Sequence, residues 1–160
     1  TMNINLRAPY LLSRRIAGHM IDTKQAGVIL HNSSIHATNS VQHFSAYAAS
    51  KAALESLSRV QALEWAPYNI RVNCFAPGVV PVERTQQSLE SAREQWMPHM
   101  PLGRFGLGED IAALALFLAL DASAWTTGQS YVADGGMLAR MDMPNRPRPD
   151  MPPMPDPIED

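Results

Sequence analysis

Three short apolar segments separated by longer helical patterns constrain this sequence more than any other feature. The segments cover residues 28–30, 70–75 and 128–133. Helices are predicted before the first segment and in the two intervals between them, at about 45–65 and 111–120. Strands that alternate with helices form parallel sheets with right-handed crossovers. The sequence therefore predicts an α/β fold with three parallel strands, of the kind found in doubly wound sheets.

The N-terminal helix has a regular apolar pattern and one interruption. Apolar residues recur at four-residue steps across residues 1–21, at Ile4, Ala8, Leu12, Ile16 and Met20. This periodicity predicts an amphipathic helix. Pro9 has no N–H group and would leave the carbonyl of Asn5 without its usual helical partner. We therefore expect the helix to kink at Pro9 or to begin near it.

Two further segments stand outside this alternation. Residues 79–107 form a long connection with a predicted helix near 85–96, and connections of this length are usually lids or binding loops. Residues 139–160 are rich in Pro, Met and Asp and poor in side chains that can form a core, so we expect a flexible tail. The expected domain is 1–138, followed by this tail.

Composition excludes several classes of function. The formal charge of the 160 residues is −2, which leaves no basic face for nucleic acid or an anionic membrane. The single cysteine, Cys74, excludes a disulfide framework and is interpreted as a buried thiol. The sequence contains no secretory signal and no apolar run long enough to span a bilayer. We expect a cytoplasmic location.

Tyr47 and Lys51 are the first candidates for chemistry. They lie four residues apart in an alanine-rich segment, so they share one face of a predicted helix. A cation next to a phenol favours the phenolate and lowers the pKa of the tyrosine toward the range useful in catalysis. Taken alone, such a pair is more often part of a solvated helix face.

The strand ends provide the context for this pair. Ligands of parallel α/β sheets bind beyond the carboxyl ends of the strands. The first predicted strand ends at Ser33 and Ser34, and the second ends in the turn 76–78. The helix that carries Tyr47 follows the first of these ends. These residues should therefore meet at one edge of the sheet.

Over roughly residues 2–138 the ordered motifs resemble the short-chain dehydrogenase/reductase family. The Asn-Ile-Asn-Leu segment near the N-terminus resembles the helix that carries the family's active-site asparagine, which maps to Asn5. Asn-Ser-Ser at the first strand end resembles the catalytic-serine motif and gives Ser34. Tyr47 and Lys51 complete a YxxxK motif. The motif YxxxK is weak alone, but the ordered set is specific.

Other stretches extend the resemblance and limit it. Residues 69–73 and 76–80 resemble the strand and turn that pack against the nicotinamide, and residues 101–106 and 127–136 match two stretches nearer the family's C-terminus. The family's first strand, its glycine-rich phosphate-binding turn and its Asn-Asn-Ala-Gly segment have no counterpart here. The chain therefore resembles the C-terminal half of a Rossmann-type enzyme, and we expect it to be inactive alone.

The resemblance implies hydride transfer between a nicotinamide and an alcohol or carbonyl carbon. Tyr47 would act as general acid or base, and Lys51 would lower its pKa and bind the nicotinamide ribose. Ser34 would hydrogen-bond the substrate oxygen. Asn5 would hold a water that links Lys51 to solvent, with Pro9 hypothesised to expose the Asn5 carbonyl.

The same resemblance implies a set of cofactor contacts. NAD or NADP would bind against Tyr47, Lys51, Pro77, Gly78 and Val80, with the preference between the two set by residues upstream. Val82 departs from the family, which often has a threonine there that helps hold the cofactor. Whether Thr85 replaces it is left open.

Candidate substrate-lining residues flank the catalytic set. His36 and His43 lie between Ser34 and Tyr47 in sequence, and Trp96 lies in the long connection. Lining of a substrate pocket and ordinary loop packing are both open for each of them. Because the histidines have no suitably spaced carboxylate or cysteine near them, no metal site is predicted.

The partner predictions also follow from the resemblance. The helices 1–21 and 45–66 should lie side by side, and in the family they form the subunit interface of a dimer or tetramer. Sugar dehydrogenases and 3-oxoacyl reductases are equally similar. A non-catalytic remnant that only oligomerises is the alternative; a nucleotide-sugar epimerase is disfavoured by the Asp-Gly-Gly ending at 134–136 without a second substrate domain.

Overall fold

The computed structural model describes residues 1–139 and contains one parallel sheet with helices on both of its faces. The strands are β1 (Gly27–Asn32), β2 (Ile70–Pro77) and β3 (Ser130–Ala133), in the order β1-β2-β3. The α-helices are α1 (Ala8–Asp22), α2 (Ser45–Trp65), α3 (Glu83–Ser91), α4 (Arg93–Trp96) and α5 (Gly108–Ala119). The predicted α/β fold with three parallel strands is confirmed. The predicted tail lies, except for Ala139, outside the described residues.

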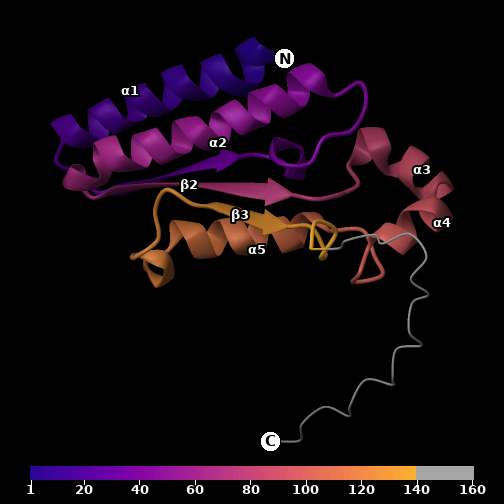
Figure 1. Cartoon of the computed structure of the whole chain (residues 1–160). Coiled ribbons are helices and arrows are strands. Elements are labelled where there is room, and N and C mark those ends of the chain that lie inside the picture. Colours follow the sequence, from indigo (N-terminus) through magenta and orange to yellow (C-terminus); the bar gives the residue numbers. More distant parts are fainter. Residues whose placement is uncertain (140–160) are drawn as a thin grey trace, which may run out of the picture.

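The layers follow from this order. Helices α1 and α2 lie side by side over one face of the sheet, and α5 covers the other face (Figure 1). Asn32 pairs with Phe75, and Pro77 pairs with Ala133, so the three strands reach their carboxyl ends at the same edge. This edge is the place where parallel sheets bind ligands.

The core between α1, α2 and the sheet is built from small and large apolar side chains. It contains Ala17, Ala62, Trp65, Ile70 and Val72. A buried polar chain crosses the same layer. His31 on β1 hydrogen-bonds Gln61 on α2 over 3.0 Å, and the Gln61 amide donates to the Ser13 hydroxyl on α1 over 2.8 Å. This chain fixes both helices to the first strand.

The buried face of α1 differs from the one that its periodicity indicates. Ile4 and Leu12, which belong to the apolar stripe, are 75% and 62% exposed, whereas Ser13 and Ala17 are buried. The small side chains at 13 and 17 let α1 approach its neighbours, and Gln61 satisfies the Ser13 hydroxyl. Most of the apolar stripe therefore lies at the surface, while Met20 packs against the core. The exposed part has a counterpart on α2 in Leu63, which is 79% exposed.

Pro9 changes the helix as predicted. Residues Asn3–Arg7 form a π-helical turn, named η1, in which the Ala8 amide donates to the Asn3 carbonyl. The regular helix α1 begins directly after it, with the proline in its first turn. Proline is tolerated there because the first amides of a helix have no intrahelical acceptor.

The long connection holds two helices instead of the single one predicted near 85–96. Helix α3 ends at Ser91 and α4 begins at Arg93, with a break at Ala92. At the start of α3, the Val82 amide donates to the Thr85 hydroxyl over 3.1 Å. Within residues 1–139, no helix is long and apolar enough to cross a membrane.

Candidate functional site

Tyr47 and Lys51 share one face of α2, as their spacing predicts. The Lys51 ammonium lies 5.6 Å from the centroid of the Tyr47 ring. It also donates a 2.7 Å hydrogen bond to the carbonyl of Asn32, the last residue of β1. Partial burial lowers the pKa of Lys51 because the charged form loses solvation. The lysine thus fixes the Tyr47 face of α2 to the end of the first strand.

Ser34 lies just beyond this strand end and is buried. Its hydroxyl oxygen accepts a hydrogen bond from the His36 amide and so caps a short 3-10 helix at Ile35–Ala37. Among residues 1–139 this hydroxyl donates to no acceptor. Its proton is therefore available to an oxygen atom of a bound molecule.

Asn5 docks the π-helical turn onto α2. Its side-chain amide donates to the Ser50 hydroxyl over 3.1 Å, and that hydroxyl donates to the Tyr47 carbonyl over 2.7 Å. The π-helical bond described for this turn joins the Ala8 amide to the Asn3 carbonyl. It does not test the carbonyl of Asn5, so exposure of that carbonyl by Pro9 stays a prediction.

The turn after β2 depends on a close approach at Gly78. The Gly78 amide donates to the Ala133 carbonyl over 2.9 Å. A Cβ atom at this position would lie 2.7 Å from the Cα of Asp134, a distance that real Cβ contacts do not reach. The Asp134 carboxylate in turn accepts from the amides of Gly136 and Leu138. Glycine is therefore required here by packing between two loops.

Two cavities meet at these residues. One, of about 440 Å³, is lined by Asn32, Ser33, Ser34, Tyr47, Lys51, Pro77, Gly78, Val80, Val82, Gly108 and Ile111. The other, of about 610 Å³, extends toward α3 and α4 and also contains Ser34, Tyr47, Gly78 and Val80 in its wall. All five residues predicted to contact the cofactor line the smaller cavity. The two cavities share the predicted serine and tyrosine as a common boundary.

The larger cavity also contains the predicted substrate-lining residues His36, His43 and Trp96. The His36 ring lies 6.0 Å from the Tyr47 ring, and Phe44 packs against both. The lining residues that were not predicted include Phe44 and Arg84. Arg84 could have been suspected because it lies in the long connection 79–107. Periodicity alone could not show toward which cavity this connection places it.

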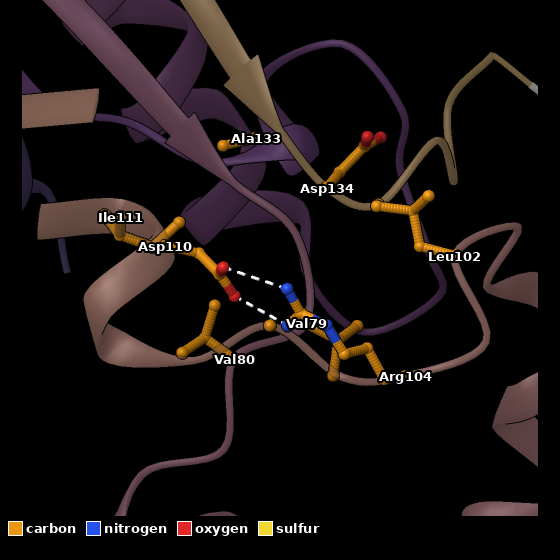
Figure 2. A pocket seen from close by; sticks show the side chains of 10 residues that line it. Val79, Val80, Leu102, Arg104, Asp110, Ile111, Ala133 and Asp134 are labelled. Atoms are coloured by element: carbon orange, nitrogen blue, oxygen red, sulfur yellow. Dashed lines mark hydrogen bonds and ion pairs between the residues drawn. The ribbon is translucent and has the colours of Figure 1, made fainter. Parts of the chain in front are cut away.

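A third cavity, of about 200 Å³, lies beside the segment Val79–Val80 (Figure 2). It includes a two-pronged ion pair in which the Arg104 guanidinium contacts the Asp110 carboxylate over 2.7 and 2.9 Å. The Gly106 amide donates to the Val79 carbonyl over 3.0 Å. The loop 103–107 therefore supports the segment that lines the two larger cavities.

Two polar residues of β2, Arg71 and Asn73, have structural roles. Arg71 donates to the carbonyls of Leu118 and Leu120 and so closes the end of α5. The buried Asn73 donates to the Thr126 carbonyl and accepts from the Gln129 amide. These contacts hold the loop before β3 against β2, at the end of the strand opposite the cavities.

The smaller cavity fits part of a nicotinamide cofactor. Lys51, Ser34 and Tyr47 provide polar hydrogens on one side, and Pro77 and Val80 provide an apolar wall of the kind that packs on a planar ring. The Thr85 hydroxyl is already used in hydrogen bonds with the backbone of Val82, so it does not stand in for a threonine at that position. Within residues 1–139 no cluster of metal-ligating side chains occurs.

Comparison with known proteins decides the family. Residues 1–138 match the family model described as enoyl-(acyl carrier protein) reductase. The chain belongs to the short-chain dehydrogenase/reductase family. Among curated members of this family, an NAD-dependent glycerol dehydrogenase of Listeria innocua is 39% identical over 85% of this chain and 54% of its own length. A 3beta-hydroxysteroid dehydrogenase 1 of Eggerthella lenta is 38% identical over 85% of this chain and 53% of its own length.

Solved structures of the same short-chain dehydrogenase/reductase type superpose closely. A 4-hydroxyisoleucine dehydrogenase complexed with NADH has a TM-score of 0.84 and 33% identity, covering 88% of this chain and 58% of that one. A gluconate 5-dehydrogenase of Burkholderia cenocepacia in complex with NADP and tartrate has a TM-score of 0.82 and 29% identity, covering 88% and 55%. The chain spans about half the length of these relatives and matches the C-terminal part of their Rossmann folds.

Proposed function

We propose that this chain is the catalytic half of an NAD(P)-dependent oxidoreductase acting on an alcohol or carbonyl group of a small molecule. The observation that carries the proposal is the common boundary of the two large cavities, where Ser34 and Tyr47 face both. A cofactor in the smaller cavity and a substrate in the larger one would then meet at these two hydroxyl groups.

Each polar residue has a role that its contacts support. Tyr47 donates the proton of its hydroxyl to the substrate oxygen in reduction and takes it back in oxidation. The Ser34 hydroxyl stabilises charge on the same oxygen. The Lys51 ammonium, held by the Asn32 carbonyl, holds the tyrosine face in place and binds polar groups of the cofactor. A bound nicotinamide supplies or accepts the hydride.

Asn5 acts through the helix that carries the tyrosine. Its amide reaches the backbone of Tyr47 through Ser50, which supports a role in positioning in addition to the predicted water contact. Pro77, Gly78 and Val80 form the remaining cofactor wall. Sugar-type and 3-oxoacyl-type substrates both stay open, because the relatives carry names of both kinds.

The test is Tyr47→Phe in the protein that includes whatever sequence is encoded upstream of Thr1. Loss of the hydroxyl should lower turnover of the alcohol or carbonyl substrate by at least about 100-fold. Tyr68→Phe, which removes an exposed hydroxyl away from the cavities, should leave turnover unchanged. Equal turnover of the Tyr47→Phe and unchanged proteins would exclude the proposed role.

The alternative is a non-catalytic remnant that only oligomerises. The exposed apolar side chains of η1, α1 and α2 favour self-association by either kind of protein. They include Ile4, Leu12, Ile16, Val60 and Leu63. We infer a homodimer or homotetramer through this surface. Leu63→Lys should shift the mass measured by sedimentation toward the monomer, while Leu116→Lys on α5 should not.

Dinucleotide binding separates the two alternatives for the chain itself. Titration of NADH and NADPH into the 160-residue chain, followed by fluorescence, should give weak binding that Lys51→Met abolishes. A chain that oligomerises and shows no binding that depends on Lys51 would support the remnant. We infer that turnover requires a further part, corresponding to the length of the relatives that this chain does not cover.

A further inference from the structure

The wall of the larger cavity contains positive and titratable side chains and no acidic ones among the residues described. Arg84 lies in the first turn of α3, and His36 and His43 come from the loop before α2. The guanidinium of arginine stays charged at all physiological pH values. The cavity that contains Ser34 and Tyr47 therefore also contains a permanent positive charge.

The charge on Arg84 is not neutralised by a neighbouring acid. The acidic residues of α3 are Glu83 and Glu90, and neither lines the cavity. Glu90 instead pairs with Arg93 over 3.2 Å. Within residues 1–139 no carboxylate pairs with Arg84, so its donors are available to an anion in the cavity.

His36 offers a hydrogen-bond acceptor in the same cavity. Its Nδ1 lies 3.0 Å from the carbonyl oxygen of Asn39. Because a carbonyl can only accept, Nδ1 must carry the proton, which leaves Nε2 of the neutral ring as an acceptor. An acceptor at this place suits a hydroxyl group of a ligand.

The backbone conformation of His43 is a second observation that is consistent with a ligand-binding wall. Its backbone has φ of 69°, in the left-handed region that residues other than glycine rarely occupy. Such conformations concentrate at ligand-binding sites, where the surrounding structure holds them. The cavity volume of about 610 Å³ lies within the usual range of small-molecule sites.

We propose that the larger cavity binds a hydroxy acid or oxo acid, with its carboxylate on Arg84 and a hydroxyl group on Nε2 of His36. The carboxylate is favoured over a phosphate ester because a phosphate ester carries close to two charges at neutral pH, whereas Arg84 is the one permanently charged side chain in the described wall. Thr1, which carries an α-amino group in the 160-residue chain, also lines the cavity, and the variant Arg84→Gln separates its contribution from that of Arg84. The identity of the reacting carbon rests on the proposed function, but binding of the acid does not.

A matched pair of probes tests the binding. D-Gluconate and sorbitol differ only in whether one end is a carboxylate or a hydroxymethyl group. Each is titrated into the chain while the indole signal of Trp96, which lines the cavity, is followed by NMR. Gluconate should bind at least about tenfold more tightly than sorbitol, as expected for one charge-assisted contact.

Substitutions of two arginines test whether Arg84 causes the preference for gluconate over sorbitol. Arg84→Gln should reduce the gluconate preference to near unity, whereas Arg93→Gln, which changes another arginine of the same connection, should retain it. Arg84→Lys keeps the charge without the paired donors and should give an intermediate preference. Equal binding of the two probes, no shift with gluconate, or a preference that survives Arg84→Gln would each overturn the proposal. Tighter binding of glycerol 3-phosphate than of gluconate would overturn the choice of carboxylate.

Different kinetic measurements test the binding of an acid and the transfer of hydride. In a form of the protein that turns over substrate, Arg84→Gln should raise KM for a hydroxy acid and leave KM for a neutral alcohol unchanged. Equal use of acids and neutral alcohols would reject the substrate class while leaving hydride transfer intact. Full turnover by Tyr47→Phe would reject hydride transfer through this tyrosine while leaving the binding result intact.

Discussion

Ser33, the residue that follows β1, donates a 2.7 Å hydrogen bond to the carboxylate of Glu55 on α2. The same carboxylate oxygen accepts a 2.8 Å hydrogen bond from Ser130, the first residue of β3. Glu55 therefore connects the two outer strands of the sheet through a helix that lies across the middle one. It stands one turn beyond Lys51, which is itself bonded to the end of β1. A row of polar contacts along α2 thus sets the position of Ser34.

Removal of this acceptor should destabilise the fold. Glu55→Ala leaves the hydroxyl groups of Ser33 and Ser130 without their partner, and we expect the free energy of unfolding to fall by about 1–3 kcal/mol. Glu55→Gln keeps a carbonyl oxygen in the same place and should cost less. Urea denaturation measures both changes. Glu64→Ala on the exposed side of the same helix is the control, and an equal effect of Glu55→Ala and Glu64→Ala would contradict this account.

The buried His31 should make stability depend on pH. Burial lowers the pKa of His31 below its ordinary value, partly offset by the hydrogen bond to Gln61. The unfolded chain therefore binds the proton more readily than the folded chain. The free energy of unfolding should be highest above pH ~6.5 and should fall as the pH drops below that value.

The variant His31→Gln isolates this contribution. Urea denaturation between pH 8 and 5.5 should give a shallower loss of stability for His31→Gln than for the unchanged chain. His99→Gln changes an exposed histidine and should leave the slope as it was. Parallel curves for His31→Gln and the unchanged chain would show that His31 does not bind its proton differently in the two states.

Local sequence signals were sufficient for the three strands and for most of the helices. Helix α2 runs from Ser45 to Trp65, as its alanine content and the following Pro67 predict. Asn69 ends this region in a left-handed conformation, with φ of 59°. Ser34, Tyr47 and Lys51 line one cavity, as strand ends and helix spacing predict. Their catalytic roles come from the family resemblance and stay proposals.

Properties that depend on distant segments could not be predicted. The four-residue stripe predicts an amphipathic helix, but the side that α1 buries depends on a distant residue. Leu12 is exposed and Ser13 is buried, because Gln61, 48 positions away in sequence, donates to the Ser13 hydroxyl. Gly78 was interpreted as a turn residue, and its closest restriction comes from the backbone of Asp134. The role of Glu55 likewise depends on residues from two strands.

Cys74 should be chemically inert in the folded chain. It is completely buried on β2, and burial raises the pKa of its thiol to about 11. Iodoacetamide reacts with the thiolate, so at pH 8 labelling should be more than about 100-fold slower than for an ordinary exposed cysteine. Because Cys74 is the single cysteine of the sequence, mass spectrometry reads the site directly. In urea the same residue should label readily, and fast labelling without urea would contradict its burial.

The ion pair of Arg104 and Asp110 should stabilise the site only above acidic pH. Hydrogen bonds from Arg104, and then from the Leu107 amide, lower the pKa of Asp110 to about 2 from an ordinary value of 3.8. The charged carboxylate is therefore favoured by folding, and its contribution is complete above pH ~4 and lost as the pH falls toward 2. Asp110→Asn should lower the Tm at pH 6, and the difference from the unchanged chain should narrow at pH 2.5.

A neighbouring pair provides the control for this measurement. Arg93 and Glu90 form an exposed pair in which one guanidinium nitrogen lies 3.4 and 3.2 Å from the two carboxylate oxygens. Exposed pairs of this kind contribute little, so Glu90→Gln should change the Tm little at either pH. The two-pronged pair differs because Asp110 also accepts from the Leu107 amide at the start of α5. It thereby holds the loop whose Gly106 amide bonds to Val79, next to the shared wall of the two cavities. A Tm difference for Asp110→Asn that is the same at pH 6 and pH 2.5 would mean that the carboxylate charge is not what holds this loop.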